Sequence, residues 1–128
     1  MLTLEEILSD VAISPGFGKV GKIDVDSRGD KGQSPLHWMA TLGDAVGISL
    51  LVEAGANINA MDIKGNTPLH EAVMCRQTSA VRLLIEQGAD ALLKNEAGFT
   101  PLDIAKSDGF GPTVDILKRN ARSKGTRS

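Results

Sequence analysis

Residues 16–22, with the sequence GFGKVGK, are the part of this 128-residue chain that most resembles a site for chemistry. They satisfy the glycine pattern G-x-G-x-x-G and nearly satisfy the phosphate-binding pattern G-x-x-x-x-G-K-[ST]. Phosphate recognition needs a strand before the glycines and a helix N-terminus after them. The flanking residues predict the inverse order, and Ile23 stands where a Mg²⁺-binding Ser or Thr belongs. We therefore predict a Gly-rich connection between Gly16 and Lys22 and keep nucleotide binding as the less favoured alternative.

Two histidines and one cysteine are the other candidates for metal binding, proton transfer or nucleophilic catalysis. His37 and His70 are 33 residues apart, and no further His or spare Cys is present to complete a zinc site. His70 and Cys75 are five residues apart on one expected helix, so their side chains point in different directions. The carboxylates of Asp62 and Glu71 show no pairing in the sequence. We predict that the chain is not an enzyme and holds no cofactor or metal.

The element that must position these side chains is a repeat of 33 residues. The segment GNTPLH at residues 65–70 recurs as GQSPLH at 32–37 and as GFTPLD at 98–103. Its glycine suits a positive φ in a tight turn, its Ser or Thr suits a helix N-cap, and its proline suits the first helical position. Apolar residues at equal offsets further on predict a second helix in each copy. This stripe consists of Ile48, Leu50, Leu51, Val81, Leu83, Leu84, Val114, Ile116 and Leu117.

The 33-residue period with its Thr-Pro-Leu-His core resembles the ankyrin repeat family. The resemblance implies an all-α repeat, an α-solenoid of helix-turn-helix pairs joined by β-hairpin-like turns, with copies at 29–61, 62–94 and 95–121. It also implies that His37 and His70 hydrogen-bond backbone groups and tie each hairpin to its helix. Asp103 replaces the histidine in the last copy and looks like part of a C-terminal cap. Residues 1–28 are predicted to form an N-terminal capping helix, at 3–12, and the Gly-rich loop.

Composition and charge limit the partners. A hydrophobic fraction of 41% fits one soluble domain. All 16 acidic residues lie at or before Asp115, whereas a basic tail at 122–128 ends the chain. An acidic body favours a protein partner with a basic surface. The N-terminal residues predict no signal peptide or membrane span, and the single cysteine fits a reducing compartment. We expect a cytoplasmic protein that is monomeric when free and binds no nucleic acid or membrane.

The ankyrin resemblance implies a binding surface made of hairpin tips and of the exposed face of each first helix. Its hairpin positions are Asp30, Lys31, Gln33, Ile63, Lys64, Asn66, Glu96, Ala97 and Phe99. Its helix positions are Trp38, Thr41, Leu42, Glu71, Met74, Cys75, Ile104, Ser107 and Asp108. Trp38 is the main candidate for an energetic hot spot. The alternative is that Trp38 packs over the N-terminal loop, and Phe99 has the similar alternative of packing on the preceding repeat.

The function expected from this resemblance is a non-catalytic protein-binding module. One concrete version is an inhibitor, such as a bacterial immunity protein or antitoxin that blocks a basic toxin enzyme. The alternative is a general adaptor or regulatory subunit, and the sequence does not separate the two.

Overall fold

The computed structural model describes residues 28, 29 and 31–125, with side chains up to Arg119. The expected capping helix at 3–12, the Gly-rich loop, Asp30 and residues 126–128 lie outside this part of the chain. The described residues form six helices and no strand. The helices are α2 (Pro35–Leu42), α3 (Ala45–Glu53), α4 (Pro68–Met74), α5 (Thr78–Glu86), α6 (Pro101–Ser107) and α7 (Gly111–Gly125).

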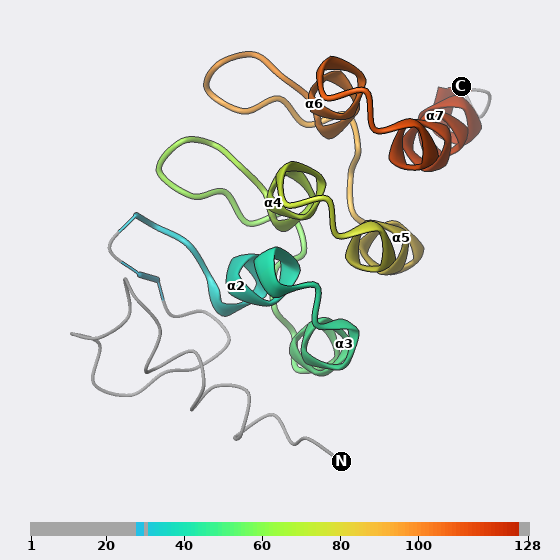
Figure 1. The fold of residues 1–128 in the computed structure, drawn as a ribbon. Helices are drawn as coiled ribbons and strands as arrows, with labels where there is room; N and C mark the ends of the chain where they lie inside the picture. Colours follow the sequence, from blue (N-terminus) through green and yellow to red (C-terminus); the bar gives the residue numbers. More distant parts are fainter. Residues whose placement is uncertain (1–27, 30, 126–128) are drawn as a thin grey trace.

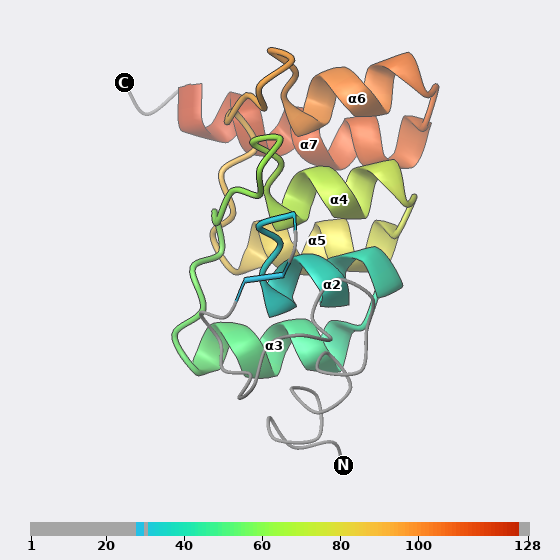
Figure 2. The ribbon, with the colours of Figure 1, turned by 90° about the vertical axis from the view of Figure 1, so that its left-hand side faces the viewer.

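The helices form two layers, and hairpins project from one of them (Figure 1). In the inner layer α4 packs between α2 and α6, and in the outer layer α5 packs between α3 and α7. Figure 2 shows the three helix pairs stacked one upon another, with the helices of both layers lying nearly parallel. The all-α repeat expected from the 33-residue period is therefore the observed fold. We call the surface formed by the hairpins and the inner helices the hairpin face.

Each inner helix begins with the predicted cap. The hydroxyls of Ser34, Thr67 and Thr100 each accept a hydrogen bond from the backbone N–H three residues on, and the side chain of that third residue returns to the cap's own N–H. A proline follows the cap in every case and has no N–H of its own to satisfy. These reciprocal capping boxes satisfy N–H groups that a short helix would otherwise leave unpaired.

Each inner helix is followed within two residues by a residue with a left-handed backbone. Gly43 and Gly109 have φ of 71° and 68°, and Arg76 occupies the corresponding place after α4 with φ of 56°. Arg76 is the one non-glycine residue with positive φ among those the structure describes. Its guanidinium lies 5.5 Å from the centroid of the Phe110 ring and donates to the Asp108 carbonyl at 3.3 Å. The side chain thus connects the second helix pair to the third.

The core lies between the two helix layers and runs through all three pairs. Alanine is frequent in it because small side chains allow neighbouring helices to approach closely. From the predicted second-helix stripe, Leu50, Leu83, Val114 and Ile116 are only half-buried and border this core. The buried members are Leu36, Met39, Ala40, Ile48, Leu51, Leu69, Ala72, Val73, Ala80, Val81, Leu84, Ala89, Ala91, Ala105 and Leu117.

Successive hairpins are joined by backbone hydrogen bonds. The N–H of Ile63 donates to the Lys31 carbonyl at 2.9 Å, and 33 residues later the N–H of Glu96 donates to the Lys64 carbonyl at 2.9 Å. Gly65 has φ of 75°, and a Cβ at this position would lie 2.8 Å from the Glu96 nitrogen. This glycine is therefore required by the close approach of the next hairpin as well as by its own turn.

Within the described ranges, no helix has the length and apolar character needed to cross a membrane.

Candidate functional site

Two histidines fix the inner helices to the hairpins. His37 Nδ1 accepts from the Ser34 N–H at 3.0 Å. Because a backbone nitrogen can only donate, the ring proton resides on Nε2, which donates to the Asn66 carbonyl at 2.7 Å. His70 repeats this arrangement with the Thr67 N–H at 3.1 Å and the Phe99 carbonyl at 2.9 Å. The expected histidine bonds to backbone groups are confirmed, and the structure adds that each ring reaches the hairpin of the following copy.

Both histidines are held in the neutral form. Burial is the first cause that lowers the pKa of His37 and of His70 below the ordinary value of 6.5. Asp103, at the same place in the last copy, caps its helix by accepting from the Thr100 N–H at 3.0 Å. A carboxylate supplies the same cap acceptor as the histidines, and the described residues after it, up to 125, form α6 and α7.

Neither nitrogen of His70 is free to act as a base for Cys75. Burial and then the charge of Glu71 raise the pKa of the Cys75 thiol above its ordinary value of 9.0. This thiol is therefore protonated at neutral pH and is a weak nucleophile.

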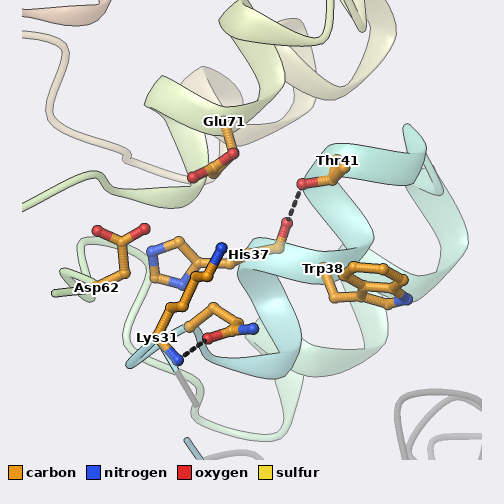
Figure 3. A pocket seen from close by; sticks show the side chains of 7 residues that line it. Lys31, His37, Trp38, Thr41, Asp62 and Glu71 are labelled. Atoms are coloured by element: carbon orange, nitrogen blue, oxygen red, sulfur yellow. Dashed lines mark hydrogen bonds between the residues drawn. The ribbon is translucent and has the colours of Figure 1, made fainter. Parts of the chain in front are cut away.

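Two adjoining cavities hollow the hairpin face between the first and second hairpins. The first, of about 220 Å³, is lined by Lys31, Gln33, His37, Trp38, Thr41, Asp62 and Glu71. The second, of about 320 Å³, is lined by Lys31, Asp62, Ile63, Lys64, Asn66, Glu71 and Met74. Their shared residues are Lys31, Asp62 and Glu71, so we treat the two as one feature, the hairpin groove. Figure 3 shows the Asp62 and Glu71 carboxylates beside the first cavity and the Trp38 indole further along α2.

Asp62 and Glu71 interact, which corrects the expectation that the carboxylates are unpaired. Asp62 lies in the second hairpin, where one carboxylate oxygen accepts from the N–H groups of Lys64 and Asn66, both at 2.9 Å. The pKa of Glu71 is raised from 4.5 to about 6, first by partial burial and then by the charge of Asp62 and hydrogen bonding between the two side chains. Lys64 acts in the opposite direction as the smallest cause.

The residues expected to form the binding surface differ in exposure. Asp30 lies outside the described residues. The exposed ones are Lys31, Leu42, Ile63, Lys64, Met74, Cys75, Glu96, Ala97, Phe99, Ser107 and Asp108. The half-buried ones are Gln33, Trp38, Thr41, Glu71 and Ile104. The hairpin groove brings together members of both sets from the first two copies, whereas none of the third-copy positions lines it.

Two expected surface residues need correction. Asn66 is buried, with 6% of its surface exposed, because its carbonyl accepts from His37 and its side-chain oxygen accepts from Asn95 at 2.9 Å. It therefore holds adjacent hairpins together instead of projecting from a tip. Trp38 does not stand clear of the scaffold either, since it is half-buried and packs against the core. Its remaining surface still lines the groove.

Sequence reasoning missed Asp62 as a groove residue. The corresponding positions of the other copies are Gly29 and Asn95. Asp62 is the one charged residue at this repeat position, and this difference between the copies could have indicated a role outside the fold.

Comparison with family models decides the relationship of the chain. The model for ankyrin repeats, in three copies, matches residues 10–95. The chain belongs to the ankyrin repeat family. Ankyrin repeats generally serve as protein-protein interaction modules and are typically non-catalytic. No curated protein in the comparison matches the chain.

Proposed function

We propose that this ankyrin repeat protein binds one protein partner across its hairpin face and acts by binding alone. The observation that carries the proposal is the hairpin groove, which lies between apolar side chains that the fold leaves wholly or partly exposed. Ile63 is 68% exposed and Met74 is 39% exposed at one end, and Trp38 borders the other. Apolar side chains of this kind gain most when a partner removes them from water.

The exposed apolar side chains continue beyond the groove into the third copy. Phe99 is 52% exposed, on the third hairpin. The core and the capping boxes account for the residues that repeat in this chain, so the exposed hairpin and inner-helix positions are the ones that differ between its copies. A partner in contact with the groove and Phe99 would span all three copies.

An inhibitor is one concrete form of this function, with an immunity protein or antitoxin against a basic toxin enzyme as the specific case. An adaptor or regulatory subunit is the alternative. The acidic body supports a basic partner surface, since complementary charge accelerates and orients association. We further propose that the free protein is a cytoplasmic monomer. Stoichiometric loss of a captured partner's catalytic activity would distinguish the inhibitor from the adaptor.

Affinity capture from native lysate tests the hairpin face. Because Trp38 packs on the core, Trp38→Ala must be accompanied by a melting curve, and Ile63→Ser is the cleaner variant. Val46→Ser is the matched control, because Val46 is 49% exposed on the outer helix α3. We expect Trp38→Ala and Ile63→Ser to lose a partner that the wild type and Val46→Ser retain. Equal recovery by all four proteins would show that the partner binds elsewhere.

A further inference from the structure

The charge of Asp62 is not needed for the turn in which it lies. At the same place in the next hairpin, the side-chain oxygen of Asn95 accepts from the Phe99 N–H at 3.0 Å. The neutral amide therefore supplies the acceptor that the hairpin requires. Asp62 accepts from the Lys64 N–H as well as from the Asn66 N–H, but an amide oxygen has two lone pairs and can accept both bonds. The negative charge that aspartate adds to the hairpin groove is therefore not required by the hydrogen bonds of its loop.

That charge lies next to a second carboxylate. Glu71 projects into the same groove from α4, at the repeat position occupied by Trp38 in the first copy and Ile104 in the third. Two carboxylates that share a partly buried site repel each other. The Asp62–Glu71 pair therefore destabilises the free protein.

The basic residues of the described chain offset the pair only in part, since the charge of Lys64 is the smallest of the causes that act on the pKa of Glu71. No lysine or arginine nitrogen of these residues lies within 4.0 Å of either carboxylate. Lys31 and Lys64 are exposed at the hairpin tips, and Figure 3 shows the Lys31 side chain reaching over the cavity. An exposed lysine can turn away at little cost, because its stem is flexible and its ammonium is strongly hydrated.

We propose that the hairpin groove receives an arginine side chain of the protein partner between the carboxylates of Asp62 and Glu71, with apolar partner residues on either side of it. Arginine suits two carboxylates because its planar guanidinium presents several N–H donors in fixed directions. Trp38 at one end of the groove, and Ile63 and Met74 at the other, supply the apolar contacts. This inference rests on the proposed function, since it names the chemistry that the hairpin face recognises.

Binding of the arginine would depend on pH through Glu71. The charged groups around this carboxyl are Asp62 and Lys64 in the second hairpin and Lys31 in the first. His37 lines the same cavity, and burial is the first cause that lowers its pKa and keeps it neutral. From α6, the neutral Ile104 occupies the equivalent repeat position. With its pKa at about 6, Glu71 is ionised at neutral pH and protonated in mild acid.

The test measures the binding of two peptide probes, at up to millimolar concentration, to the full chain. NMR chemical shifts of the backbone amides and of the Trp38 indole report the binding. The probes are acetyl-Leu-Arg-Leu-amide and its neutral isostere acetyl-Leu-citrulline-Leu-amide. Asp62→Asn keeps the turn acceptor, as Asn95 does, and Glu71→Gln keeps the size of the side chain. Glu86→Gln is the control, because Glu86 is an exposed carboxylate on the outer helix α5.

We expect saturable binding of the arginine peptide, with shifts confined to the groove, and at least tenfold weaker binding of the citrulline peptide. Asp62→Asn and Glu71→Gln should each bind the arginine peptide about tenfold more weakly, a free-energy change of the same size as a shift of one pKa unit. Glu86→Gln should bind it as the wild type does. Lys31→Met should bind more tightly, because it removes a competing cation. Binding by the wild type should weaken as the pH falls through about 6, and binding by Glu71→Gln should not. Both carboxylate variants should unfold at higher temperature than the wild type when no peptide is present.

Other results separate this inference from the proposed function. Equal binding of the two peptides in the groove would overturn arginine selectivity and leave the hairpin face as a binding surface. If neither peptide shows saturable binding, the inference is wrong. The capture experiment separately decides whether the hairpin face binds a protein partner. Binding that survives in both carboxylate variants would show that another part of the protein holds the peptide.

Discussion

Arg76 is held in a backbone conformation that costs free energy, and its side chain offsets that cost. With φ of 56° it lies in the left-handed region, where a residue with a Cβ is less stable by about 1–2 kcal/mol. The contact with Phe110 contributes about 0.5–1 kcal/mol at an exposed site, and the bond to the Asp108 carbonyl about 0.5 kcal/mol. The two opposing terms are of similar size, which explains why arginine is tolerated where Gly43 and Gly109 occupy the other copies.

Two substitutions separate these terms. Arg76→Ala removes the contacts but keeps the strained backbone, so we expect a loss of about 1–1.5 kcal/mol in the free energy of unfolding. Arg76→Gly removes the same contacts and relieves the strain. Its greater freedom in the unfolded chain costs about 0.5–1 kcal/mol. We therefore expect Arg76→Gly to be more stable than Arg76→Ala by about 0.5–1 kcal/mol and slightly less stable than the wild type.

Urea unfolding of the full chain, followed by circular dichroism at neutral pH, measures these differences. A double-mutant cycle with Phe110→Leu isolates the contact with the aromatic ring. Gly43→Ala is a matched control at the equivalent position. It should be destabilised by about 1–2 kcal/mol, because the glycine φ is 71° and the new Cβ would also displace the Gln77 carboxamide. An Arg76→Gly protein no more stable than Arg76→Ala would refute the strain argument, and an Arg76→Ala protein equal to the wild type would refute the contacts.

Three further predictions concern the remaining repeat positions. Gly65→Ala should lower the free energy of unfolding by at least about 1 kcal/mol more than Gly98→Ala, since both have positive φ but only Gly65 has the next hairpin within 4 Å; equal losses in urea would contradict this. Thr113→Val should raise the melting temperature, because the buried Thr113 hydroxyl has no hydrogen-bond partner among the described residues, and a lower melting temperature would show that the hydroxyl is bonded. In a Glu71→Gln background, the contribution of neutral His37 and His70 to the free energy of unfolding should be complete above pH 6.5 and should fall at lower pH. The reason is that both histidines have a lowered pKa in the folded protein, so below pH 6.5 the unfolded chain binds more protons than the folded one. The background is needed because Glu71, with its raised pKa, contributes in the opposite sense and loses its contribution as the pH rises through about 6. Urea unfolding at several pH values measures this change, and a flat profile would contradict the role of the histidines.

The capping boxes show which parts of the site the sequence could predict. Ser34 and Thr67, each followed by proline, specify a local event within four residues, so both helix starts are where the sequence places them. The histidine bonds to backbone groups were implied by the ankyrin resemblance. Their second bonds, to Asn66 and Phe99, cross 29 residues. They depend on how closely two copies stack, which no local pattern specifies.

The sequence by itself determined the repeat, its turns, its caps and its family, because these follow from period, residue type and short-range hydrogen bonding. Only the tertiary structure decided which of the variable positions share a surface. Asp62 and Glu71 are separated by a turn and a helix start, and stacking of the hairpins beside α4 places both in one groove with Lys31 from the preceding copy. The same stacking buries Asn66 and half-buries Trp38. The burial of a side chain depends on all its neighbours in space, whereas a cap depends only on its neighbours in the chain.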